Sequence, residues 1–134
     1  MEKFTFKIMS QEKKDKKVSI DILKNNVNEY IRERDWKKYH RPKDLAMSMA
    51  IESSELMEIF QWEDKKSIQK MLDDKNEMEK IRDEIADITI YILSFCNETE
   101  IDLSSAVLNK IKKVKEKYPK EKVLDNEIYK KDNL

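Results

Sequence analysis

Apolar residues recur every three or four positions along four stretches of the chain, which is the spacing of one face of an α-helix. This pattern predicts helices over about 19–36, 42–62, 77–97 and 102–118, and it leaves room for a short helix at 67–72. Ser19 and Asp102 suit the N-cap position, Pro42 suits a first turn, and Pro119 is expected to end the last helix.

No stretch of comparable length has the alternating pattern of a strand, so we expect an all-α, four-helix-bundle-like domain over 18–119. Residues 1–17 are expected to form a flexible N-terminal arm, in which 4–8 alternate enough for a brief strand. Residues 120–134 are expected to be a charged C-terminal extension. The 77–97 helix is also apolar outside its main stripe, at Ala86, Ile90 and Leu93, which favours burial on several sides and thus a homo-oligomer.

Two of the predicted helices carry a pair of acidic residues beside the apolar stripe. At about 100° per residue, Glu52 falls within the apolar face of the 42–62 helix, and Glu55 lies on its margin about 60° away. Glu84 and Asp87 repeat this arrangement on the 77–97 helix. If the two stripes pack together, the two acid pairs converge.

Converging carboxylates repel one another unless some are protonated or a cation lies between them. Arg82 lies about 160° from Glu84 around the helix, so it is poorly aimed to neutralise that carboxylate. Carboxylates are the ligands that Mg²⁺ and Mn²⁺ prefer, and one divalent ion offsets several of them. The alternative is that all four acids are solvated residues on helix edges, against which the duplicated placement argues.

The composition excludes several other kinds of chemistry. The chain has no glycine, which removes the glycine-rich phosphate loops, and its single histidine, His40, argues against a serine triad or a zinc site with nitrogen and sulfur ligands. The 28 basic and 28 acidic residues cancel, so no basic excess points to nucleic acid, and no apolar run is long enough to predict a membrane span. Cys96, the only cysteine, cannot form an internal disulfide and favours a cytoplasmic protein.

The motif Glu52-Ser53-Ser54-Glu55, followed after 28 residues by Glu84-Ile85-Ala86-Asp87, resembles the E-x-x-E … E-x-x-D signature of MazG-like nucleotide pyrophosphohydrolases. The similarity covers about 20–119 and is strongest to the dCTP pyrophosphatase branch. The landmarks that carry it are Arg34-Asp35-Trp36, Tyr39-His40-Arg41-Pro42, Glu55-Leu56-Met57-Glu58-Ile59-Phe60-Gln61-Trp62, Asp87-Ile88-Thr89-Ile90-Tyr91 and Lys117-Tyr118-Pro119.

This resemblance implies Mg²⁺-dependent hydrolysis of a (deoxy)nucleoside triphosphate, such as dCTP or a modified nucleotide, to the monophosphate and pyrophosphate. It also implies a helical bundle assembled as a homodimer or homotetramer. The acids Glu52, Glu55, Glu84 and Asp87 are then the expected catalytic residues and metal ligands, with Mn²⁺ as an alternative ion. The expected substrate-binding residues are Trp62, Tyr91, Trp36 and His40 around the nucleotide, and Lys110, Lys113 and Lys117 at the phosphates.

The sequence leaves two other hypotheses about function to be weighed. A non-catalytic helical interaction module would bind no divalent ion and would tolerate replacement of Glu52 or Asp87. A di-iron bundle needs Glu-x-x-His motifs, and His40 belongs to none. Related sequences often carry an asparagine where this chain has Val114, so no polar nucleotide contact is assigned to that position.

Overall fold

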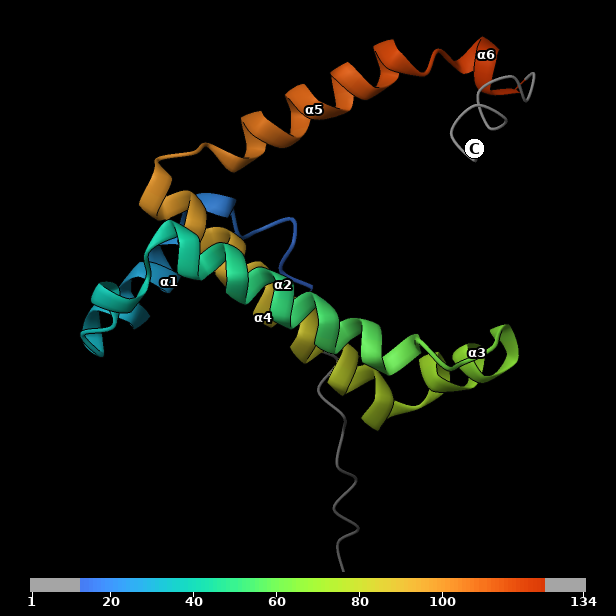
Figure 1. Ribbon diagram of the computed structural model, residues 1–134, viewed down its shortest axis with the longest axis horizontal. Helices are drawn as coiled ribbons and strands as arrows, with labels where there is room; N and C mark the ends of the chain where they lie inside the picture. Colours follow the sequence, from blue (N-terminus) through green and yellow to red (C-terminus); the bar gives the residue numbers. More distant parts are fainter. Residues whose placement is uncertain (1–12, 125–134) are drawn as a thin grey trace, which may run out of the picture.

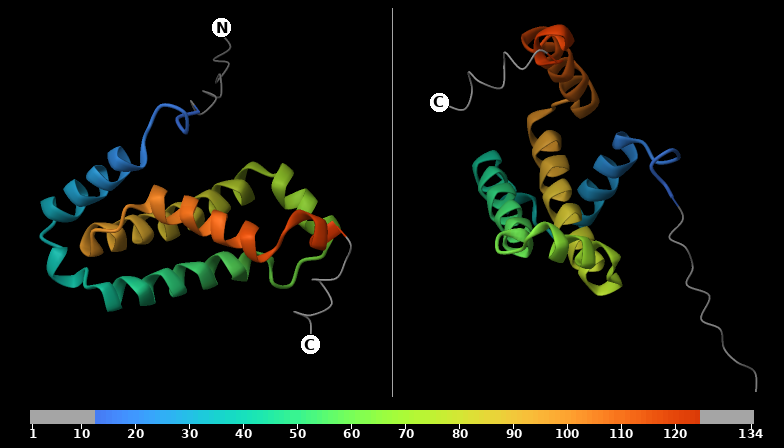
Figure 2. Two further views of the ribbon diagram at one scale, coloured as in Figure 1. Left: turned by 90° about the horizontal axis from the view of Figure 1, so that it is seen from above. Right: turned by 90° about the vertical axis from the view of Figure 1, so that its right-hand side faces the viewer.

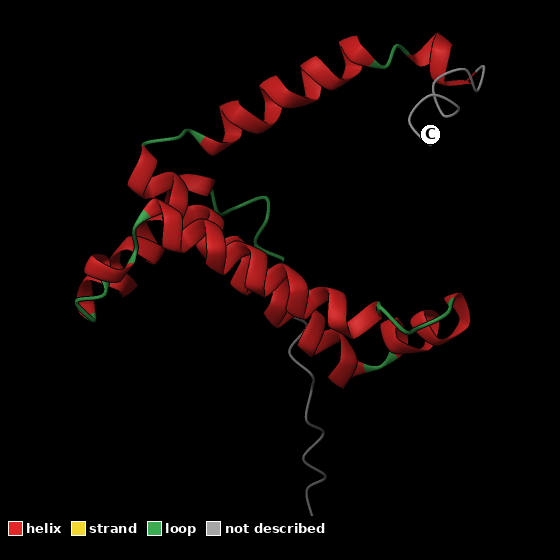
Figure 3. Ribbon diagram, in the orientation of Figure 1, coloured by secondary structure: helices red, strands yellow, loops and turns green. Residues whose placement is uncertain are grey.

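The computed structural model describes residues 13–124, and this part of the chain is built from helices without a strand (Figure 3). The all-α prediction is therefore confirmed, whereas the brief strand expected at 4–8 and the end of the charged extension lie outside the described residues. The elements in chain order are α1 (Ile20–Glu33), a short 3-10 helix η1 (Lys37–Tyr39), α2 (Pro42–Phe60), α3 (Lys65–Asp73), α4 (Lys75–Thr99), α5 (Leu103–Lys117) and α6 (Lys120–Leu124).

The helix ends follow from hydrogen bonds between residues that are close in sequence. The Ser19 hydroxyl accepts a hydrogen bond from the Ile22 N–H at 3.2 Å, and the Asp102 carboxylate accepts one from the Ser105 N–H at 2.8 Å. Both side chains satisfy an N–H that has no partner within the helix. Pro42 occupies the start of α2, where its missing N–H costs nothing. The predicted starts of these three helices are confirmed.

The helix that follows Pro119 was not expected. Pro119 separates α5 from α6, as predicted, but the chain returns to a helix at Lys120–Leu124. A proline is tolerated at the beginning of a helix, so the residue that ends α5 is compatible with a new helix directly after it. The predicted short helix at 67–72 is present as the longer α3, which Asp64 caps.

The helix α4 is the centre of the fold. In the right-hand view of Figure 2, α4 lies between α2 and α1. Extensive packing within the described residues joins α4 to α2, to α1 and to α3, and α2 runs alongside α4 over most of its length (Figure 1). The α1 side is also tied by polar contacts, since the Asn97 amide donates to the Lys24 carbonyl at 3.0 Å and the Lys24 ammonium donates to the Ile101 carbonyl at 2.7 Å.

The apolar core among the described residues lies between α1 and α4, and a further buried side chain lies at the start of α2. Val27 and Ile31 of α1 pack with Leu93 of α4, and the partly buried Leu103 contacts this cluster. Leu45, at the start of α2, is only 1% exposed. Leu93 lies outside the apolar stripe that the sequence predicted for α4, and its burial follows because α1 and α2 cover different faces of this helix.

The helix α5 extends away from the other helices (Figure 1). Leu103 at its start is partly buried, but the larger apolar side chains further along it are exposed. The exposed fractions are 49% for Val107, 66% for Leu108, 46% for Ile111 and 42% for Val114. The predicted apolar stripe of this helix therefore has little to pack against within one chain. None of the described helices combines the length and apolar character that crossing a lipid bilayer requires.

Candidate metal centre

The packing of α2 against α4 brings three acidic side chains together. Glu52, Glu55 and Glu84 each offer a carboxylate oxygen, and these three oxygens lie within 4.8 Å of one another. Glu52 and Glu55 are one turn apart on α2, whereas Glu84 comes from the facing turn of α4. Carboxylate oxygens this close to one another are an arrangement that a hard divalent cation can bridge.

Asp87 lies beside this group, one turn after Glu84 on α4. Its negative charge acts on both Glu52 and Glu84 and contributes to raising the pKa of each. In each case burial is the largest cause, followed by the charge of Glu55 and then that of Asp87. The pKa of each of these two carboxyl groups is therefore raised by burial together with repulsion from neighbouring acids.

One carboxylate oxygen in this cluster has no partner among the described residues. The Oε2 atom of Glu84 is buried, and no described group donates a hydrogen bond to it. A buried charged oxygen without a partner is costly, whereas a bound divalent cation would satisfy it. The donor set and this orphaned atom both fit Mg²⁺ or Mn²⁺, which take oxygen ligands.

An open pocket of about 360 Å³ lies against the acidic cluster. The described residues that line it are Glu55, Glu58, Ile59, Lys80 and Glu84. The sequence reasoning missed Lys80, although a signal for it exists, because Lys80 is one helical turn before Glu84 and shares its face. Arg82 has the orientation expected for it and pairs with Glu79, 3.3 Å away, rather than with the cluster.

The aromatic residues expected at the nucleotide lie in three places. Trp36 packs edge-on against Tyr30 with ring centroids 5.6 Å apart, and the Arg34 guanidinium lies 4.6 Å from the centre of the Tyr30 ring. His40 is tied to this group, because its Nδ1 atom is 2.7 Å from the Trp36 carbonyl oxygen.

Two further aromatic residues flank α2 and α4. Trp62 follows the end of α2 and is 87% exposed, and Tyr91 is half-buried on α4. None of Trp36, His40, Trp62 and Tyr91 is among the described residues that line the acidic pocket. Their role in substrate binding stays a prediction.

The three lysines expected at the phosphates belong to α5. Lys110, Lys113 and Lys117 are exposed, and the Lys117 ammonium lies 4.9 Å from the centre of the neighbouring Tyr118 ring. Because α5 extends away from α2 and α4 (Figure 1), these lysines are not among the described residues that line the pocket of the same chain. Their predicted phosphate contacts also stay a prediction.

Comparison with known proteins identifies similar chains. The family model described as the MazG-like family matches residues 47–132. The chain is 30% identical over 91 residues to dCTP pyrophosphatase 1 of Rattus norvegicus and 32% identical over 91 residues to that of Bos taurus. Each match covers 68% of this chain and 54% of the relative, so the chain spans about half the length of the curated relatives it matches.

A solved structure resembles the fold as well. The crystal structure of a pyrophosphatase from Archaeoglobus fulgidus DSM 4304 superimposes with a TM-score of 0.70 at 39% sequence identity. The match covers 75% of this chain and 93% of that one. The likeness therefore extends over nearly the whole of the solved protein and over three quarters of this chain.

Proposed function

The chain belongs to the MazG-like family, and we propose on this basis that it hydrolyses nucleoside triphosphates to the monophosphate and pyrophosphate with the help of a divalent cation. The observation that carries the proposal is the group of three carboxylate oxygens within 4.8 Å of one another. These oxygens come from the two helices that carry the E-x-x-E and E-x-x-D motifs. The names of the similar proteins, dCTP pyrophosphatase 1 and a pyrophosphatase, support the same reaction class.

In this proposal Glu52, Glu55, Glu84 and Asp87 hold Mg²⁺, and Mn²⁺ suits the same ligands. When bound, the ion supplies positive charge that attracts phosphate oxygens and lowers the pKa of a bound water. The contribution of the chain is to position the metal ligands. The helices α2 and α4 hold the acidic side chains so that their oxygens are already close together before substrate binds. Glu58 lines the same pocket, so its carboxylate is available to accept a proton from the attacking water.

The proposed substrate is a deoxynucleoside triphosphate, either dCTP or a modified nucleotide, because the curated relatives are dCTP pyrophosphatases. Trp36, His40, Trp62 and Tyr91 are the proposed contacts to the nucleotide, and Lys110, Lys113 and Lys117 are proposed contacts to its phosphates. Aromatic rings stack on bases, and lysine contacts phosphate as a point charge. Measuring the hydrolysis of a panel of canonical and modified triphosphates distinguishes an enzyme selective for dCTP from one that accepts a wider range of nucleotides.

The test of the reaction is pyrophosphate release with and without Mg²⁺, from the native protein and from Glu52→Gln. We expect release that needs the metal and that falls at least about 100-fold in the variant, since a ligand carboxylate is lost. Glu79→Gln is the matched control, because Glu79 is an exposed acid of α4 that pairs with Arg82. A folded native protein that releases no pyrophosphate from any triphosphate would contradict the proposal and favour a helical interaction module.

We propose further that the working form is a homodimer or homotetramer. The support is the exposed apolar stripe of α5, together with exposed Met47, Ile51 and Met57 on α2. Large exposed apolar surfaces mark association sites in soluble proteins. Sedimentation at several concentrations tests this, and a monomer mass that stays constant with concentration would contradict it.

A cytoplasmic location is also proposed, because the only cysteine, Cys96, is a buried free thiol that needs no oxidising compartment. Recovery of the protein from a secreted fraction would argue against this location.

A further inference from the structure

Lys80 lines the pocket beside the acidic cluster and differs in charge from the acids there. Three acids, Glu55, Glu58 and Glu84, line this pocket together with Ile59, and Lys80 is the one cationic side chain among its described lining residues. It comes from α4, one turn before Glu84, and it lines the pocket together with Glu55 and Glu58 of α2.

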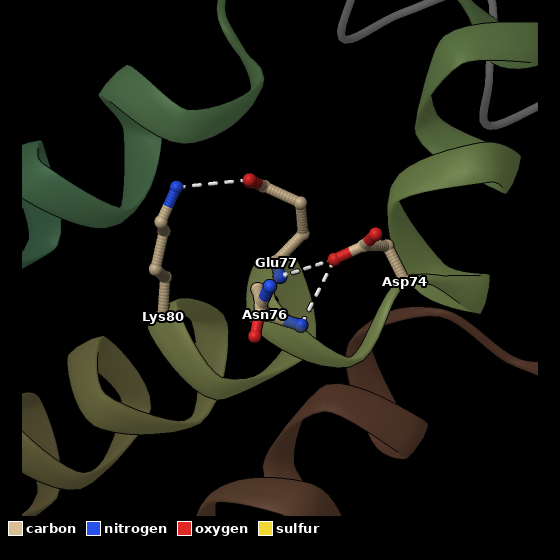
Figure 4. A network of polar contacts seen from close by, with 4 residues as sticks. All are labelled: Asp74, Asn76, Glu77 and Lys80. Carbon is tan, nitrogen blue, oxygen red and sulfur yellow. Dashed lines mark hydrogen bonds and ion pairs between the residues drawn. The ribbon is translucent and has the colours of Figure 1, made fainter.

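The local structure of α4 keeps Lys80 on this side of the helix. Asp74 caps α4 by accepting hydrogen bonds from the N–H groups of Asn76 and Glu77 at 2.9 and 3.0 Å. One turn later, the Lys80 ammonium donates to the Glu77 carboxylate at 2.8 Å (Figure 4). The Glu77 carboxylate raises the pKa of the Lys80 ammonium, so this side chain remains charged wherever the enzyme would work.

The ion pair with Glu77 leaves Lys80 available to a ligand. Its side chain is 62% exposed, and an ion pair this open is held weakly. An ammonium group also has three donors, of which Glu77 uses one. Lys80 can therefore contact a second anion in the pocket without first leaving Glu77.

The charge of the pocket requires such a cation. A triphosphate carries several negative charges, and a pocket lined by three carboxylates repels it. A divalent ion held by the acids would offset part of this charge, and a cationic side chain in the pocket would offset more of it. Lysine is suited to this place because it contacts phosphate as a point charge and needs no fixed geometry.

We propose that Lys80 is a phosphate-contact residue, which binds the part of the phosphate chain that leaves as pyrophosphate. This role rests on the proposed hydrolysis of triphosphates at the same pocket. The competing interpretation is a surface ion pair between residues three apart on a helix, which supports α4 and has no role in binding. In that case loss of Lys80 and loss of Glu77 remove the same interaction and have the same effect.

The experiment compares Lys80→Met, Lys80→Arg and Glu77→Gln with Lys70→Met, an exposed lysine of α3 outside the pocket lining. Calorimetry measures the binding of inorganic pyrophosphate in the presence of Mg²⁺, and pyrophosphate release from triphosphates measures kcat and KM. We expect Lys80→Met to weaken pyrophosphate binding and to lower kcat/KM by about 10- to 100-fold, the usual size of one charged hydrogen bond. Lys80→Arg should retain most of both, and Lys70→Met should match the native protein.

The outcomes separate the two interpretations. Glu77→Gln keeps the charge of Lys80, so we expect it to bind pyrophosphate within about threefold of the native protein. Two results would overturn the proposal for Lys80: equal losses of pyrophosphate affinity in Lys80→Met and Glu77→Gln, or native affinity in Lys80→Met. Either result is compatible with hydrolysis of triphosphates by the native protein. A native protein that neither binds pyrophosphate nor releases it would instead overturn the proposed function, and this assignment with it. Thermal unfolding of each variant shows whether the fold is retained.

Discussion

Glu55 on α2 and Glu84 on α4 have 28 residues between them in the sequence, yet a carboxylate oxygen of each lies within 4.8 Å of the other and of an oxygen of Glu52. The chain between them folds back through α3, which packs on the beginning of α4. Because α2 and α4 pack side by side, each motif supplies part of one cluster, and neither motif could form it alone.

Addition of Mg²⁺ or Mn²⁺ should stabilise the protein against heat. A ligand that binds only the folded state at a concentration 100 times its Kd adds about 2.7 kcal/mol to the free energy of unfolding. Glu84→Gln should lose this response, since Glu84 provides the orphaned oxygen of the cluster. Glu79→Gln should keep it, and thermal melts with and without the ion measure both. An unchanged melting temperature of the native protein at millimolar metal would argue against a metal site.

Without metal, the acidic cluster should make the protein less stable as the pH rises. Burial and neighbouring acids raise the pKa of Glu52 and Glu84 above the ordinary value of 4.5. The folded state therefore binds more protons than the unfolded state between 4.5 and the raised values, and the free energy of unfolding falls as the pH rises through this window. Above it, both groups are ionised and the contribution stays constant.

The comparison that isolates this effect is native protein against Glu52→Gln, unfolded by denaturant in EDTA at several pH values. We expect the variant to be the more stable one at pH 8, and the difference to shrink towards about pH 4.5, where the native carboxyl becomes protonated. Asp64 and Asp102 have the opposite dependence, because hydrogen bonds from Ser67 and Ser105 lower their pKa. Both aspartates are present in the two proteins, so their effect cancels. A difference that does not vary with pH would contradict the prediction.

Leu45 is buried at the beginning of α2, with 1% of its surface exposed. Leu45→Ala leaves a cavity and should lower the free energy of unfolding by about 2 to 5 kcal/mol. Lys43→Ala, an exposed position on the same turn, should change it by no more than about 0.5 kcal/mol. Denaturant unfolding measures the free energy of unfolding of both variants. Equal changes in the two would show that burial of Leu45 does not stabilise the fold.

Asp74 should be the side chain that determines where α4 begins. Its carboxylate accepts hydrogen bonds from two N–H groups of the first turn, at 2.9 and 3.0 Å (Figure 4). Asp74→Ala should cost about 1 kcal/mol of stability, whereas Asp74→Asn, which is an equally good N-cap, should cost little. Far-ultraviolet circular dichroism and denaturant unfolding measure the two variants. A loss as large in Asp74→Asn as in Asp74→Ala would point to charge rather than capping.

The sequence by itself determined the main helices and the starts of α1, α2 and α5. Ser19 and Asp102 cap helices through hydrogen bonds that span three residues, and such bonds depend only on the local chain. The spacing of apolar residues likewise placed Glu52 and Glu84 on the packed faces of their helices, because the helical repeat relates position to direction. A composition without glycine and with one histidine narrowed the chemistry to carboxylates.

The tertiary structure alone decided which faces meet. The sequence predicted the apolar stripe of α5, yet Ile111 and Val114 on it are exposed, and the lysines of this helix are not among the described residues that line the acidic pocket. Lys80 lines that pocket, and its spacing from Glu84 places it on the same helix face without showing that this face borders a pocket. The reason is physical: helix ends depend on neighbours a few residues away, whereas the partner of a helix face depends on the direction in which the connecting turns send the next helix.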